Sequence, residues 1–116
     1  MQVLSDAGAF TAPGAGSGVH WVEHLSAGDL SVGTYSIAAG ADDDQEPHTE
    51  DEIYVVTAGR ATLQVDGPGA RAVPVGPGSV IHVPAGEPHH FTAITSDLAA
   101  IVLFAPAEYS RRHVGH

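Results

Sequence analysis

The stretch GADDDQEPHTEDEIYVVTAG, residues 40–59, decides how this chain folds. Its second half is rich in β-branched and aromatic residues, and the two-residue period of a strand places Glu52, Tyr54 and Val56 on one inner face. Its first half is polar and holds His48, four residues before Glu52. On one straight strand their Cα atoms would lie about 13 Å apart. The pair can therefore share a ligand only if the chain bends between them.

A second stretch with an initial glycine, GSVIHVPAGEPHHF at residues 78–91, supplies a matching histidine, His89. The alternation of side chains along a strand places His89, Phe91 and Ala93 on one face. This strand has to approach the His48 segment from a neighbouring position for the two histidines to meet.

The side chains of His48, Glu52 and His89 together offer two imidazole nitrogens and one carboxylate. Such a donor set suits a divalent ion of Mn, Fe, Co, Ni, Cu or Zn and leaves coordination positions open for chemistry. The chain has no cysteine, which excludes zinc fingers and iron–sulfur clusters. An inward carboxylate in an apolar strand, such as Glu52, is either paired with a cation or lies near solvent at the start of the strand, and metal coordination would account for it. We therefore expect a divalent metal ion as cofactor.

Short runs typical of β-strands, separated by Gly and Pro, fill the rest of the chain, and helical periodicity is nowhere sustained. A length of 116 residues suits one domain, and we place its barrel core at residues 19–106 and a polar tail at 107–116. The pattern predicts a small all-β sandwich or barrel. The expected strand runs are 19–25, 30–39, 52–58, 61–67, 70–75, 79–84, 89–95 and 98–106.

Charge and hydropathy limit the partners of the chain. Fourteen Asp and Glu oppose four Arg and no Lys, so the net charge of −10 leaves no basic surface for nucleic acid. No apolar run reaches the roughly 18 residues that span a bilayer, and the N-terminus lacks the pattern of a secretory signal. We expect no membrane partner and a cytoplasmic location. The acidic run Asp42–Asp44 is interpreted as a solvated loop.

The two glycine-containing stretches resemble the motifs of the cupin superfamily, and the resemblance covers roughly residues 19–106. The first motif, G(x)5HxH(x)3,4E(x)6G, is matched in register by Gly40, His48, Glu52 and Gly59, and Glu46 stands at the first histidine position. The second motif, G(x)5PxG(x)2H(x)3N, is matched by Gly78, Pro84, Gly86 and His89, and Ala93 replaces the final Asn. The resemblance implies a double-stranded β-helix, the jelly-roll barrel of cupins, with the metal inside.

The resemblance also implies a ligand set. His48, Glu52 and His89 match three of the four usual metal ligands of cupins, and Glu46 is the candidate at the fourth position. Glu46 either coordinates as a carboxylate or points away and leaves three ligands. In an alternative register His48 is the first motif histidine, and Glu50 then takes the second ligand position. We favour Glu46, because it preserves the spacing to both flanking motif positions.

Single-domain cupins include dioxygenases, isomerases, lyases and polyketide cyclases, so the resemblance implies a metal-dependent enzyme that acts on a small organic molecule. Tyr54 and Glu46 are the candidate catalytic groups for proton transfer. The alternatives are a non-catalytic module that binds or senses a small molecule with a degenerate metal site, and an accessory protein. We also expect a homodimer, because the apolar strand run at 19–25 would form an edge that needs cover.

Overall fold

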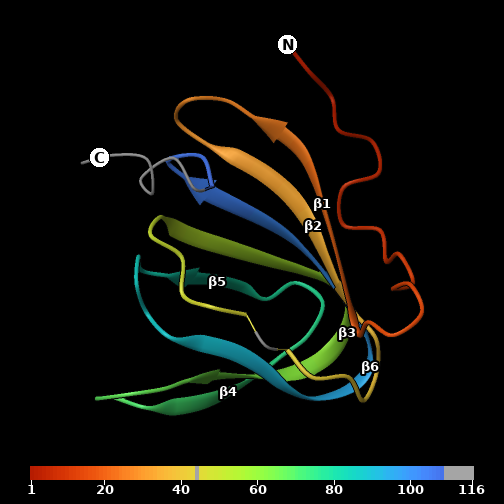
Figure 1. Ribbon diagram of the computed structural model, residues 1–116, viewed down its shortest axis with the longest axis vertical. Helices are drawn as coiled ribbons and strands as arrows, with labels where there is room; N and C mark the ends of the chain where they lie inside the picture. The colour runs from red at the N-terminus through yellow and green to blue at the C-terminus, as the bar shows by residue number, and fades with distance from the viewer. Residues whose placement is uncertain (44, 109–116) are drawn as a thin grey trace.

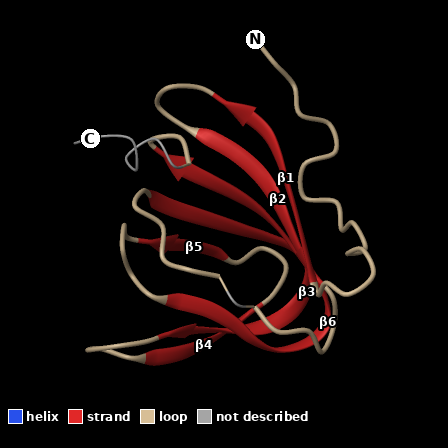
Figure 2. Cartoon of the chain, viewed as in Figure 1, coloured by secondary structure: helices blue, strands red, loops and turns tan. Residues whose placement is uncertain are grey.

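The computed structural model describes residues 1–43 and 45–108, which form strands and loops (Figure 1; Figure 2). All strand pairs are antiparallel. None of the described residues belongs to a helix that could cross a membrane. The strands are β1 (Val19–Ser26), β2 (Ser31–Ile37), β3 (Asp51–Val65), β4 (Arg71–Val75), β5 (Val80–Val83) and β6 (His89–Ala105).

The all-β prediction is confirmed, but two pairs of expected runs are continuous strands. The runs 52–58 and 61–67 belong to β3, and the runs 89–95 and 98–106 belong to β6. Backbone pairing between β3 and β6 continues past the glycine and polar residues that separate the runs in the sequence. These residues bend the strands and do not end them.

The long strands β3 and β6 belong to both layers of the fold. The first half of β3, residues 51–56, pairs with β5 and with the end of β6, and β2 and β1 follow on the far side of β6. The second half of β3, residues 61–65, pairs with β4 and with the start of β6. Figure 1 shows the two layers facing each other like the walls of a half-open sandwich.

At the bend of β3, the alternation of buried and exposed side chains shifts by one residue. Buried side chains fall on even-numbered residues from Glu52 to Val56 and on odd-numbered residues from Ala61 onwards. The pairing of β3 with β6 is irregular between Val56 and Thr62. An extra residue in one strand switches the face that each later side chain takes. Because the strand also turns here, both of its halves face the same interior.

Gly59 sits at this bend for a steric reason. Its φ is +83°, and a Cβ atom there would lie 2.2 Å from the carbonyl oxygen of Asp97 on β6. An L side chain would meet both backbone strain and a clash with backbone. The glycine that closes the first sequence motif therefore allows the two long strands to bend together.

The equivalent bend in β6 corrects one sequence expectation. His89 and Phe91 are buried as predicted, whereas Ala93 is exposed and has a positive φ of 49°. This left-handed backbone ends the alternation, and Ile94 takes the next buried position.

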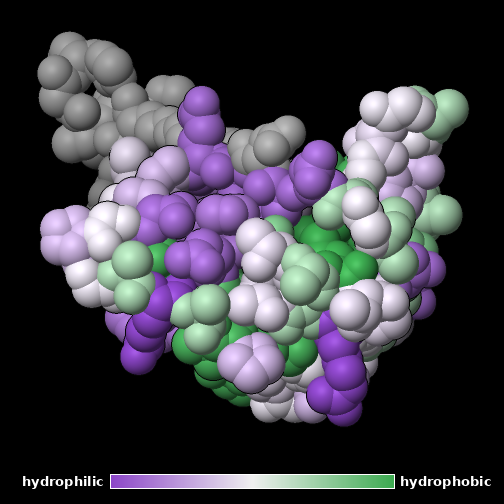
Figure 3. Space-filling view, turned by 90° about the horizontal axis from the view of Figure 1, so that it is seen from below, coloured by the Kyte–Doolittle hydropathy of each residue, from purple (hydrophilic) through white to green (hydrophobic). Residues whose placement is uncertain are grey.

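The core lies between the two layers and is mainly apolar and aromatic. Its largest fully buried side chains include Tyr54, Phe91, Phe104, Ile37 and Leu98. On the outside, hydrophobic side chains stand among hydrophilic ones, as Figure 3 shows for one face.

The start of the expected polar tail is packed against the barrel. Ala107 is buried, and the side chain of Glu108 is only 7% exposed. The backbone N–H of Glu108 donates to the hydroxyl of the buried Ser31 at 2.8 Å. Residues 107 and 108, the first two of the expected polar tail, therefore belong to the packed structure, and residues 109–116 lie outside the described part of the chain.

Replacing Gly59 by Ala should lower the free energy of unfolding by about 3 kcal/mol, because positive-φ strain adds to overpacking against β6. Denaturant unfolding measures this change. Gly67→Ala is the matched control, because Gly67 has a φ of +87° but open space at its Cβ position; it should cost about 1 kcal/mol. Equal losses in the two variants would contradict the steric role of Gly59.

Candidate metal and ligand site

The three predicted metal ligands meet at one end of the interior. Glu52 lies on the first half of β3, His89 begins β6, and His48 lies just before β3. The oxygen Oε1 of Glu52 lies 3.0 Å from Nε2 of His89 and 4.0 Å from Nδ1 of His48. The bend expected between His48 and Glu52 is present at Thr49 and Glu50. Sequence reasoning therefore identified three side chains that the fold brings together.

Glu46 does not join this group. Its side chain is exposed, and the neighbouring Gln45 lines the cavity beside His48 and Glu52. The inward position belongs to Gln45 because its amide is held by two buried groups, Asp43 and Tyr54. Glu46 therefore does not take the inward position expected for it, and Gln45, one residue earlier, takes that position.

Glu50, the ligand of the alternative register, is buried but does not line the cavity. Its carboxylate accepts a hydrogen bond from the hydroxyl of Thr49. The geometry therefore does not bring Glu50 to His48 and Glu52 as a further cavity ligand.

Asp43 corrects the interpretation of residues 42–44 as a solvated loop. It is 6% exposed and accepts hydrogen bonds from the Tyr35 hydroxyl at 2.5 Å, the Gln45 amide at 2.6 Å and the Phe91 backbone N–H at 2.8 Å. Three donors are what a buried carboxylate needs to remain in an apolar interior. Asp43 thereby ties the loop before β3 to both β2 and β6, while Asp42 is exposed and residue 44 is outside the described part.

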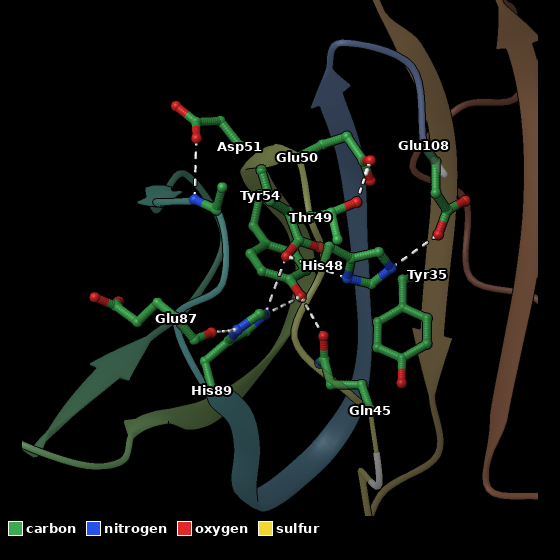
Figure 4. A network of polar contacts seen from close by, with 12 residues as sticks. Tyr35, Gln45, His48, Thr49, Glu50, Asp51, Tyr54, Glu87, His89 and Glu108 are labelled. Atoms are coloured by element: carbon green, nitrogen blue, oxygen red, sulfur yellow. Dashed lines mark hydrogen bonds and ion pairs between the residues drawn. The ribbon is translucent and has the colours of Figure 1, made fainter. Parts of the chain in front are cut away.

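A chain of polar contacts runs from Asp43 through Gln45, Tyr54 and His89 to Glu52, and Figure 4 shows its central members pointing towards one another. Because the Asp43 carboxylate only accepts, the Gln45 amide nitrogen faces it, and the Gln45 oxygen faces Tyr54. The Tyr54 hydroxyl donates to that oxygen at 2.8 Å and lies 3.0 Å from Nε2 of His89. The proton of Tyr54 is therefore directed to Gln45.

His89 is oriented from its other nitrogen. Nδ1 lies 2.8 Å from the carbonyl oxygen of Glu87, which can only accept, so Nδ1 carries a proton. Nε2 then faces the oxygens of Tyr54 and Glu52, each at 3.0 Å. This is the tautomer and orientation of a histidine that offers Nε2 to a metal, and without a metal Nε2 favours a proton.

Two pKa shifts follow from these contacts. Burial lowers the pKa of His89, but the contact with Glu52, the Glu87 carbonyl and the charges of Glu52 and Asp43 outweigh it, so the pKa is raised from 6.5. Burial, followed by the charge and contact of Glu52, raises the pKa of Tyr54 well above its usual 10.0. Tyr54 therefore keeps its proton at neutral pH.

Glu108 is a site residue that sequence reasoning missed. Its Oε2 lies 2.9 Å from Nε2 of His48, and the carboxylate thereby turns Nδ1 of His48 towards Glu52 (Figure 4). No motif marks Glu108, because it follows the end of β6 and reaches the site only through the fold. The sequence feature closest to Glu108 is the apolar strand run that ends just before it.

The side chains of this site border a cavity of about 200 Å³. This is small compared with pockets of about 300 to 1,000 Å³ for drug-sized ligands. The cavity residues are Trp21, Tyr35, Gln45, His48, Glu52, Tyr54, Val102, Phe104 and Glu108.

The donor set fits a divalent metal, although the described side chains are not already arranged as a complete group of three ligands. Two ligand atoms at about 2.1 Å from one metal ion lie roughly 3 Å apart, close to the 3.0 Å between His89 and Glu52 and somewhat less than the 4.0 Å to His48. Oε1 of Glu52 is fully buried and makes no hydrogen bond of good geometry. A small shift of His48 would complete a site of two nitrogens and one oxygen.

Comparison with known proteins agrees with the motifs. The sequence model of the family described as "Cupin domain" matches residues 33–106. An uncharacterised protein of Streptomyces coelicolor is 42% identical over 88 residues, which are 76% of this chain and 81% of the relative.

Solved structures with similar folds include a Rhizobium leguminosarum protein of unknown function, with a TM-score of 0.74, 21% identity and coverage of 91% of this chain and 97% of that chain. A second is the DMSP lyase DddQ of Ruegeria pomeroyi, with a TM-score of 0.68, 22% identity and coverage of 75% and 46%. The present chain thus spans less than half of that lyase, and the likeness shows the shared jelly-roll fold.

Replacing Asp43 by Ala should lower the free energy of unfolding by about 2–4 kcal/mol, because three buried donors lose their acceptor. Denaturant unfolding measures the loss. Asp42→Ala is the neighbouring control at an exposed position and should change it by less than about 0.5 kcal/mol. A loss of similar size at both positions would contradict the role of Asp43.

Metal-free protein should show a His89 imidazole that titrates above pH 6.5 in an NMR titration. Because the folded-state pKa is raised, protonated His89 stabilises the fold fully below pH 6.5, and this contribution is lost as the pH rises through the folded-state pKa. The stability difference between the wild type and His89→Gln should therefore shrink from pH 6 to pH 8. A His89 pKa at or below 6.5 would contradict the assigned contacts.

Proposed function

The chain belongs to the cupin family, and from this we propose that it is a metal-dependent enzyme acting on a small organic molecule, of the dioxygenase, isomerase, lyase or cyclase type. The observation that carries the proposal is the approach of His48 and His89 to Glu52, beside a cavity that His48 and Glu52 line. Two histidines around one buried carboxylate oxygen supply two nitrogen donors and one oxygen donor for a metal ion.

In this proposal His48, Glu52 and His89 hold one divalent ion. The metal supplies Lewis acidity to an oxygen of the substrate, or redox chemistry if it is Fe, Mn or Cu. Glu108 and the Glu87 carbonyl hold the outer nitrogens of the two histidines, as outer partners of metal-binding histidines do.

Tyr54 is the proposed proton donor. Its raised pKa keeps the hydroxyl protonated, and it lies beside His89 on the cavity wall. It acts as an acid, because a hydroxyl with a raised pKa carries its proton at neutral pH and almost no phenolate is present to act as a base. Gln45 directs this hydroxyl, while Glu46 is exposed and takes no part in proton transfer.

The second candidate is a non-catalytic binding or sensing protein with a degenerate metal site. The observation that favours it is the neutral amide of Gln45 in the cavity, next to a site where cupins usually have a fourth ligand. The metal content of the purified protein, measured by elemental analysis, distinguishes the two candidate functions.

Elemental analysis after reconstitution with Mn, Fe, Co, Ni, Cu or Zn should find about one metal ion per chain. His48→Ala, Glu52→Gln and His89→Ala should each reduce metal affinity at least tenfold, since each removes one of three ligands. Glu46→Gln is the matched carboxylate control at an exposed position and should keep wild-type affinity.

Wild-type protein that takes up none of these metals would overturn the metalloenzyme proposal and leave the binding or sensing function. Metal retained equally in all three ligand variants would place the ion elsewhere. Equal losses in Glu46→Gln and Glu52→Gln would return Glu46 to the ligand set.

A further inference from the structure

Part of the cavity wall is aromatic, and it adjoins the polar residues of the site. Trp21 from β1 packs edge-to-face against Tyr35 from β2, with ring centroids 6.4 Å apart, and against Phe104 from β6 at 6.1 Å. All three rings line the cavity. Trp21 is 37% exposed, so this wall reaches the surface of the protein.

The polar wall carries negative charge. Glu52 and Glu108 line the cavity, and Asp43 lies behind Tyr35 and Gln45. Among the described cavity residues there is no Arg or Lys. Arg60 and Arg71, the arginines in the described ranges, lie on the second half of β3 and on β4, in the other layer of the fold.

The charge balance stays negative even with a metal in place. Three carboxylates, Asp43, Glu52 and Glu108, against a divalent ion leave a net charge of −1. Buried carboxylates are costly unless positive charge lies near them. A further cation in the cavity is therefore attracted by the carboxylates that line it.

We propose that this cavity binds a small organic cation that carries an alkylated ammonium group. The group lies against the faces of the aromatic wall and is attracted by the Glu108 carboxylate. Aromatic rings attract such cations through their negative faces, and alkyl groups make them cheaper to desolvate than a metal ion or Lys-type ammonium. The volume of about 200 Å³ admits a few heavy atoms beyond this group.

Other ligand classes fit these walls less well. An anionic ligand would meet carboxylates without a described arginine to pair with, and a neutral apolar ligand would leave the charge unbalanced. The inference rests on the proposed function only in taking this cavity as the substrate site. Binding needs neither metal nor turnover, so the two proposals can fail separately.

The test compares three molecules of nearly the same shape: choline, its neutral carbon analogue 3,3-dimethylbutan-1-ol, and the anion 3,3-dimethylbutanoate. Trp21 is the only tryptophan of the chain and reports binding through its fluorescence, in chelator-treated full-length protein. Choline should bind about tenfold or more tightly than the neutral analogue, and the anion should not bind. Equal or tighter binding of the neutral analogue or the anion, or no binding of choline, would overturn the proposal.

Two variants locate the site, with binding measured by calorimetry because one removes the fluorophore. Glu108→Gln and Trp21→Leu should each weaken choline binding about three- to tenfold. Glu108→Gln should leave the weak affinity for the neutral analogue unchanged. Glu46→Gln removes the same charge at an exposed position and should leave both affinities unchanged.

Circular dichroism confirms that each variant is folded, and if one is not, the other still decides the location. Choline binding that survives in folded Glu108→Gln and Trp21→Leu would place the cation elsewhere and overturn the proposal. Loss of choline binding in the Glu46→Gln control to the same degree would do so too, because it would indicate a general effect of net charge.

Discussion

The bend shared by β3 and β6 is the constraint on which the rest of the structure depends. Gly59 lets β3 pass the Asp97 carbonyl of β6, and the phase change that follows turns both halves of each long strand towards one interior. Glu52 and Tyr54 come from the half of β3 before the bend, and His89 comes from the half of β6 that belongs to the other layer. If the strands ran straight, these groups would lie on separate surfaces. The site forms because the two bent strands bring both layers to face one interior.

The sequence predicted the parts of the site that local pattern controls. Two-residue alternation placed Glu52, Tyr54 and Val56 inside, and motif spacing selected His48 and His89. Strand alternation is a strong signal because a slip of one residue would exchange buried and exposed faces. For the same reason the prediction failed where the backbone breaks the alternation, as at Ala93 with its positive φ.

The positions in loops could not be derived in this way. Residues 42–48 have no strand period, so only the tertiary contacts decide that Asp43 and Gln45 face inward and Glu46 outward. An acidic run is read as solvated by default, yet Asp43 is buried because donors from β2, β6 and its own loop converge on it. The position of Glu108 depends on how the chain folds back after β6, and no sequence pattern around Glu108 predicts this.

The charge balance of this site differs between the metal-free protein, the proposed metal-bound protein and the proposed complex with a ligand cation. Asp43, Glu52 and Glu108 are buried in one region. In the described part of the chain, the residues that can supply positive charge there are histidines. Without a metal, a proton on His89 partly balances this charge, which is why the contacts with Glu52 and Glu87 raise its pKa. In the proposed metalloenzyme, a divalent ion would take the place of that proton at Nε2 of His89, so metal uptake would release a proton. The proposed ligand cation would lie against the aromatic residues and be attracted by the remaining negative charge of the cavity. A metal ion and a ligand cation are both positive, so each would reduce the attraction of these carboxylates for the other. The number of buried carboxylates, rather than the ligand motif alone, sets the chemistry that this barrel supports.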